Sequence, residues 1–162
     1  ELTIEILLVC KQASSYDEAK KLVEMAISNG LGLEKLREMI KYQEGNDQVI
    51  DDYSILPIAN ERIDLEYESD ENVYVETINA LMIGEAAMLL GAGRATIDDK
   101  IDLGVGIVLN KKVGDKISKG DILATIYTNG QNTEQAIQMV LDSYLMSDKT
   151  ILPREIILDT IK

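Results

Sequence analysis

The chain has 162 residues, 46% of them hydrophobic, and a formal net charge of −13. This hydrophobic content is sufficient for a buried core and excludes a disordered chain, while the acidic excess excludes the basic stripe that nucleic-acid binding requires. No run of apolar residues approaches the roughly 20 that span a bilayer. We therefore expect a soluble protein that binds neither nucleic acid nor membrane.

The chain contains one cysteine, Cys10, and no histidine. A single cysteine cannot form a disulfide within the chain, which suits a reducing compartment, so we expect a cytoplasmic protein. Because no histidine is present to activate the thiol, we interpret Cys10 as a small core residue rather than a nucleophile. The chain starts at Glu1 inside an expected helix, so we also expect a longer parent protein.

Residues 1–57 have helical periodicity. Three helices are predicted there, at residues 2–11, 15–29 and 33–43. The first is apolar almost all round, which is typical of a helix buried on several sides. Ser15 and Glu18 have the spacing of a capping box at the start of the second, and Gly30 supplies the left-handed residue that ends it. Pro57 then breaks the pattern.

From residue 61 the apolar period changes from helical to alternating, which indicates strands. We predict the order β-β-α-β-β-β-α, with elements at residues 63–67, 73–78, 80–90, 103–109, 113–121, 122–127 and 133–145. Asn79 is placed to cap the first of these helices, whose nearly continuous apolar residues predict a central position. Two Gly-Asp steps, at Gly114 and Gly120, flank a short strand. The predicted fold class is α+β.

One block of the sequence contains specific motifs in addition to its apolar periodicity. It consists of IGEAAMLLGAGR at 83–94, IDLGVGIVL at 101–109, KKVGD at 111–115 and KGD at 119–121. In order and spacing these segments resemble the C-terminal domain of pyrimidine-nucleoside and thymidine phosphorylases, and the resemblance extends upstream through 28–30, 43–46 and 49–52. The chain has Glu44-Gly45 and Val73-Tyr74-Val75 where the family usually has Gly-Gly and Gly-Tyr-Val, which affects only two turns.

The resemblance implies an α/β-hammerhead, or barrel-sandwich-like, domain over 58–162. It implies that the helical segment 1–57 is the edge of a larger α/β domain, a remnant of that domain in this chain. It also implies a parent enzyme, a homodimer, that catalyses reversible phosphorolysis: phosphate attacks the anomeric carbon of a pyrimidine nucleoside and releases the free base and a pentose 1-phosphate.

The family's catalytic groups lie upstream of the matched region, and this chain has neither a histidine nor a K-x-S-x-G-like loop. We therefore carry over no catalytic, cofactor-binding or metal-binding residue. Phosphate is expected only as the co-substrate of the parent enzyme. The chain itself is expected to be a structural domain that is inactive alone.

Three local features allow a functional interpretation. The run Gly91–Arg94 could form an anion nest, but its position favours a helix C-terminus. The acidic group 98–102 could bind a metal, but its spacing is not that of a calcium loop and favours a solvated loop. Residues 113–127 share the turn pattern of biotinyl and lipoyl carrier domains, which is the alternative function. The nearby Lys111, Lys112 and Lys119 lack the hairpin-tip setting of a carrier lysine.

Overall fold

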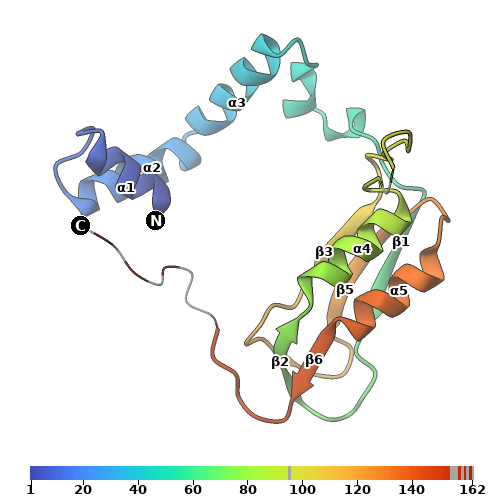
Figure 1. The fold of residues 1–162 in the computed structure, drawn as a ribbon. Helices are drawn as coiled ribbons and strands as arrows, with labels where there is room; N and C mark the ends of the chain where they lie inside the picture. The colour runs from blue at the N-terminus through green and yellow to red at the C-terminus, as the bar shows by residue number, and fades with distance from the viewer. Residues whose placement is uncertain (95, 154–156, 158, 160, 162) are drawn as a thin grey trace. The chain divides into compact units, whose positions relative to one another are not determined.

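The computed structural model describes residues 1–94, 96–153, 157, 159 and 161. The chain folds as two compact units, Glu1–Leu56 (unit 1) and Pro57–Lys162 (unit 2). Unit 1 is helical, whereas unit 2 combines helices with two antiparallel sheets (Figure 1). The α+β class predicted from the sequence is therefore confirmed; the hammerhead arrangement stays a prediction.

Unit 1 consists of α1 (Leu2–Val9), α2 (Tyr16–Ser28), α3 (Leu31–Tyr42) and the short 3-10 helices η1 (Asp47–Ile50) and η2 (Tyr53–Ile55). The predicted cap is present in part: the Ser15 hydroxyl accepts the Glu18 amide at 3.3 Å, but the Glu18 carboxylate accepts the amide of Ser14, one residue before the cap, at 2.8 Å. Gly30 has a φ of 81°, as expected for the residue that ends α2.

Two predictions for the start of the chain are wrong in the described structure. Of the residues in α1, Ile4 alone is buried, and Val9 is 80% exposed. Cys10, interpreted as a core residue, is exposed as well. The physical reason is that α1 is apolar on all sides, whereas α2 packs against only one of them. Periodicity reports how apolar a helix is but not how many neighbours cover it.

The side chain of Arg37 in α3 forms an ion pair with Asp51, the residue that follows η1. Its guanidinium donates two hydrogen bonds to the Asp51 carboxylate, at 2.8 and 2.7 Å, and its Nε lies 3.2 Å from a Glu34 carboxylate oxygen. The paired hydrogen bonds with Asp51 raise the pKa of Arg37, and the same bonds lower the pKa of Asp51. This bidentate geometry fixes the chain that follows α3.

Unit 2 contains β1 (Glu61–Glu66), β2 (Val73–Ile78), α4 (Ala80–Leu90), β3 (Gly106–Leu109), β4 (Lys116–Ile117), β5 (Ile122–Thr128), α5 (Thr133–Asp142) and β6 (Tyr144–Ser147). One sheet has the order β1-β5-β3 and the other β4-β2-β6, with antiparallel pairing throughout the described strands. The consecutive strands β1 and β2 thus lie in different sheets. Each sheet is assembled from segments far apart in the sequence.

The helix predicted at 133–145 is too long, and a strand was missed. In the structure α5 ends at Asp142, and Tyr144 begins β6 by pairing with Ile78. The apolar helical spacing continues through Tyr144, but a tertiary contact overrides it. The buried Tyr144 hydroxyl donates to the carbonyl oxygen of Leu123 at 2.9 Å and to that of Lys111 at 3.2 Å. The observed order is therefore β-β-α-β-β-β-α-β.

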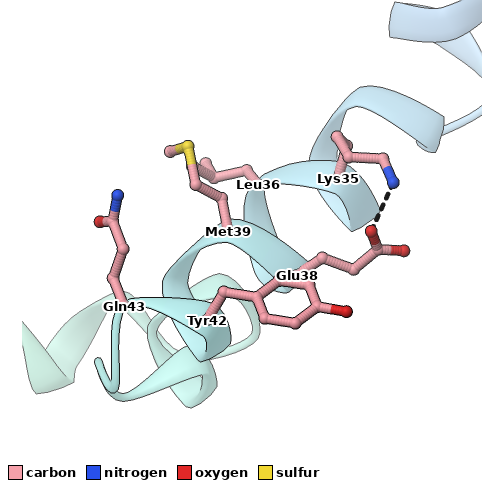
Figure 2. Close-up of a pocket in the computed structure, with 6 residues that line it drawn as sticks. All are labelled: Lys35, Leu36, Glu38, Met39, Tyr42 and Gln43. Atoms are coloured by element: carbon pink, nitrogen blue, oxygen red, sulfur yellow. Dashed lines mark hydrogen bonds and ion pairs between the residues drawn. The ribbon is translucent and has the colours of Figure 1, made fainter.

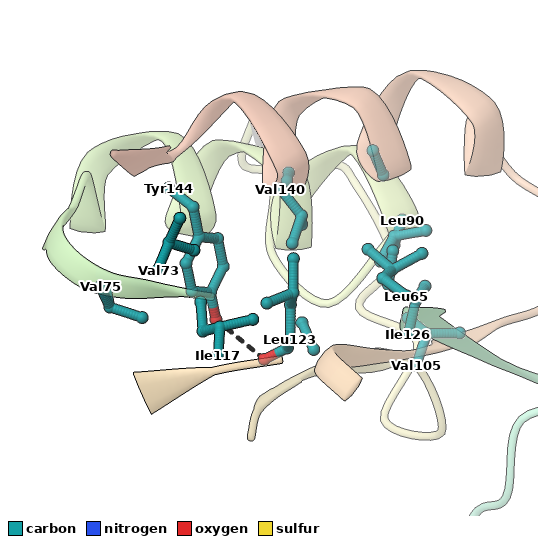
Figure 3. Close-up of a cluster of buried hydrophobic side chains, with 13 residues drawn as sticks. Leu65, Val73, Val75, Leu90, Val105, Ile117, Leu123, Ile126, Val140 and Tyr144 are labelled. Atoms are coloured by element: carbon teal, nitrogen blue, oxygen red, sulfur yellow. Dashed lines mark hydrogen bonds between the residues drawn. The ribbon is translucent and has the colours of Figure 1, made fainter. Parts of the chain in front are cut away.

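The prediction of a central position for α4 is also wrong. The helix packs along α5, and the two cover one face of the strands, so that core side chains lie between helices and sheets (Figure 3). Ala86 and Leu90 of α4 are buried, whereas Leu81 is 70% exposed. The Asn79 cap is confirmed, because its side-chain oxygen accepts the amides of Leu81 and Met82.

The core of unit 2 is one continuous cluster. Its fully buried members include Val75, Leu90, Ile117, Ile126 and Val140, drawn from β2, α4, β4, β5 and α5. Such a cluster joins both sheets and both helices, so each element depends on the others for burial. Unit 2 therefore has the interior of an independent domain.

Two matching turns bracket β4. In the first, Asp115 Oδ2 accepts the Lys112 amide at 2.7 Å; in the second, Asp121 Oδ2 accepts the Ser118 amide at 2.8 Å. Both turns also contain an i to i+3 backbone hydrogen bond and a glycine with positive φ, at 93° for Gly114. The two Gly-Asp steps predicted from the sequence are confirmed as turns.

Candidate functional site

The Gly91–Arg94 run forms a helix C-terminus. Gly91 has a φ of 102°, and the amides of Gly91 and Ala92 donate to the carbonyls of Met88 and Ala87, at 3.0 Å each. These two amides complete the helix and are not available to cradle an anion. The predicted helix end is confirmed, and the first two amides of the run serve the backbone of α4.

The acidic residues of the following loop stabilise the loop itself. Asp99 accepts the Thr96 amide at 2.9 Å, and the Asp102 carboxylate accepts the Gly104 amide at 2.9 Å and the Asn129 side chain at 2.6 Å. These hydrogen bonds, the Gly104 amide first, lower the pKa of Asp102. Within the described residues, no three His, Cys, Asp or Glu side chains converge as metal ligands would.

Two of the three lysines near the Gly-Asp turns, Lys111 and Lys119, are paired with carboxylates. Lys111 Nζ lies 2.8 Å from Asp121 Oδ2 and donates to the Lys116 carbonyl at 3.2 Å. The bond from Lys111 lowers the pKa of Asp121. Lys119 Nζ lies 2.7 Å from Asp70 Oδ1. A carrier lysine must be free to receive a prosthetic group, so these contacts do not favour the carrier alternative.

A shallow apolar hollow of about 600 Å³ lies on α3 (Figure 2). It is lined by Lys35, Leu36, Glu38, Met39, Tyr42 and Gln43. Lys35 and Glu38 form an ion pair with each other. The hollow therefore offers apolar surface and no unpaired charge, which suits contact with another apolar surface better than chemistry. The sequence predicted a helix over residues 33–43, but the exposure of Leu36 and Met39 within it could not be read from spacing.

The buried polar side chains of the described residues are structural. Every buried side-chain nitrogen or oxygen in the described residues has a hydrogen-bond partner. The largest described shift in a buried group belongs to Tyr144, whose pKa is raised to about 12, chiefly by burial and then by the charge of Asp115. Both carbonyl partners of its hydroxyl are backbone groups of the core, so this tyrosine is structural.

Comparison with known families identifies the class of the second unit. Residues 74–147, from β2 to the end of β6, match the family model described as the pyrimidine nucleoside phosphorylase C-terminal domain. The matched segment contains both helices α4 and α5, the sheet β4-β2-β6 except for Val73, and both Gly-Asp turns. This segment is therefore similar to the C-terminal domain of pyrimidine nucleoside phosphorylases, and the resemblance found in the sequence is confirmed.

Particular relatives extend the match beyond that domain. The chain is 43% identical over 150 residues to the pyrimidine-nucleoside phosphorylase of Bacillus subtilis (strain 168), a match that covers 93% of this chain and 34% of the relative. It is 40% identical over 149 residues to the enzyme of the same name from Staphylococcus aureus (strain USA300), with 92% and 34% covered. The chain spans about a third of the length of these relatives. No helix in its described residues is long and apolar enough to cross a membrane.

Proposed function

We propose that this chain is the C-terminal structural part of a pyrimidine-nucleoside phosphorylase. The complete enzyme converts a pyrimidine nucleoside and phosphate into the free base and a pentose 1-phosphate. One observation carries this proposal: the chain is 43% identical over 93% of its length to a protein of that name, of which it spans 34%.

The role assigned to the chain is scaffolding. Phosphorolysis brings together an anionic nucleophile, a cation developing on the sugar and a base leaving with negative charge, so the rate depends on positioned charged groups. The described residues instead form a packed core, and their buried polar side-chain atoms all have hydrogen-bond partners. A net charge of −13 also opposes the approach of phosphate.

Further parts of the proposal concern the complete enzyme. It is a cytoplasmic homodimer, and phosphate is its co-substrate rather than a bound cofactor. The segment represented by this chain contributes no cofactor-binding residue. This part of the proposal is supported by Asp102, Lys111 and Lys119, whose charged groups already bond to other residues of unit 2.

Release of free base by the purified chain tests the scaffolding role. Thymidine or uridine is incubated with phosphate and the 162-residue chain at high concentration, and base is quantified by chromatography. We expect no release above buffer, with the Bacillus subtilis relative as the positive control. Release that scales with the concentration of the chain, and persists after removal of host phosphorylase, contradicts the proposal.

A further inference from the structure

The first residues of unit 2 are held by parts of the chain that are distant in sequence. Residues 58–60, here called the entry segment, follow the boundary between the two units and precede β1. The Asn60 amide donates to the side-chain oxygen of Asn129 at 2.7 Å, across 69 positions of the chain. Ala59 packs against the core of unit 2. The entry segment is therefore an ordered part of unit 2 rather than a free linker.

Asp102 sets the orientation of the Asn129 side chain. Asn129 Nδ2 donates to Asp102 Oδ2 at 2.6 Å, which leaves Asn129 Oδ1 to accept the Asn60 amide. The other carboxylate oxygen, Asp102 Oδ1, accepts the Gly104 amide at 2.9 Å. Each oxygen of this carboxylate thus has its own donor. An asparagine at position 102 could accept only one of the two bonds, because its amide nitrogen would meet a second donor.

Gly104 brings the loop that contains Asp102 against the same entry segment. A Cβ at position 104 would lie 3.0 Å from the Ile58 carbonyl carbon and 3.1 Å from the Ala59 nitrogen. These are backbone atoms, which cannot turn aside as a flexible side chain can. A glycine therefore fits this close approach without displacing the segment. The bridge through Asn129 and the backbone contact at Gly104 hold the entry segment at two points.

We propose that Asp102 is a positioning residue of the complete phosphorylase: together with Asn129 and Gly104 it forms a clamp on the entry segment. This segment is the covalent connection between unit 2 and the polypeptide that precedes it, so the clamp fixes how unit 2 is attached. The inference rests on the proposed function and adds the residues that align unit 2. A displacement of about 1 Å that arises far from the reacting atoms can lower a reaction rate on the order of a hundredfold.

A reciprocal exchange of two side chains tests the clamp. Asp102→Asn leaves one of two donors without an acceptor, and Asn129→Asp places a second carboxylate opposite Asp102. In the double variant all three hydrogen bonds can form again. The carboxylate then at 129 accepts the Asn60 amide and the side-chain amide at 102, whose oxygen accepts the Gly104 amide. Asn79→Ala is the matched control, because it removes the α4 cap and takes no part in the clamp.

Hydrogen exchange of the Asn60 amide, measured by NMR in the 162-residue chain, reports the clamp directly. We expect this amide to exchange about tenfold faster in each single variant and at close to the wild-type rate in the double variant. In Asn79→Ala the rate at Asn60 should not change, because this exposed amide exchanges by local opening. Equal rates in the wild type and both single variants would overturn the proposal.

Activity is measured in a chimera, the Bacillus subtilis relative with its matched C-terminal third replaced by this chain. Each single variant should lower kcat about tenfold at a temperature at which all the proteins are folded, and the double variant should restore it. The Asn79→Ala chimera should keep the kcat of the unmodified chimera, since a loss of stability alone does not move the entry segment. A kcat that the single variants leave unchanged, or that the double variant fails to restore, contradicts the positioning role.

The two measurements separate this proposal from the proposed function. An unmodified chimera without activity rejects the proposed function and with it the positioning role, whereas faster exchange at Asn60 in the single variants still supports the clamp. An active chimera that is indifferent to the single variants rejects the positioning role alone.

Discussion

Removal of the Tyr144 hydroxyl tests how unit 2 is held together. In Tyr144→Phe the ring remains buried, and the hydrogen bonds to the carbonyls of Leu123 and Lys111 are lost. The Leu123 carbonyl also accepts the amides of Asn110 and Lys111, at 2.9 and 3.1 Å, so it keeps partners. The cost is therefore that of about one neutral hydrogen bond shared between two acceptors, ~1 kcal/mol of unfolding free energy.

The pH dependence of this variant has a definite sign. Burial raises the pKa of Tyr144 to about 12 from its ordinary value of 10. The folded state thus prefers the protonated phenol, and the stability that this preference contributes is fully present below pH 10 and is lost as the pH rises through 12. The stability advantage of the wild type over Tyr144→Phe should therefore fall over that window and reverse before pH 12, because a shift of about two pKa units outweighs one neutral hydrogen bond.

Urea unfolding followed by circular dichroism measures both effects. Tyr53→Phe is the matched control, because Tyr53 is 69% exposed and its loss of a hydroxyl should leave stability unchanged. A Tyr144→Phe protein as stable as the wild type at pH 7 would show that the two carbonyl contacts contribute nothing. An advantage of the wild type that grows between pH 10 and 12 would refute the assignment of the raised pKa to the buried phenol.

Two further pairs of substitutions probe the backbone of unit 2. Asn79→Ala removes the cap of α4 and should cost about 1 kcal/mol in urea unfolding, whereas Asn79→Asp keeps an acceptor and should cost less; equal costs would contradict the capping role. Gly114→Ala should destabilise more than Gly120→Ala, although both glycines have positive φ, because a Cβ at 114 would lie 2.7 Å from the Pro153 nitrogen and one at 120 would contact nothing within 4 Å. For Gly120→Ala the strain alone is about 1 kcal/mol, and a reversed order would show that the crowding at 114 is relieved at no cost.

Features governed by neighbouring residues were predictable from the sequence. The Ser15 and Asn79 caps, the left-handed glycines and the two Gly-Asp turns depend on hydrogen bonds within four residues, and the structure contains them. Tyr144 was assigned to a helix because its spacing continues the helical pattern, whereas its burial against β5 is a long-range contact. Spacing carries no information on such contacts.

The number of neighbours that cover each helix could not be predicted from the sequence either. The apolar residues of α1 predicted burial on several sides and those of α4 a central position, but each helix has an exposed side in the described structure. For the same reason the exposure of Leu36 and Met39 on α3 could not be predicted from their spacing. The interpretation that no catalytic residue should be assigned came from the resemblance and stays a prediction. The hydrogen bonds of Asp102 and Lys111 supply its structural support.

The most direct test of the central claim is phosphorolysis by the chimera of the Bacillus subtilis relative and this chain. Initial rates of base release from thymidine and uridine are compared with those of the intact relative and of the relative lacking its matched third. If this chain is the C-terminal structural part of such an enzyme, the chimera should recover kcat/KM to within roughly tenfold of the intact relative, about 1.4 kcal/mol of transition-state stabilisation. A folded chimera that releases base no faster than the truncated relative would contradict the account.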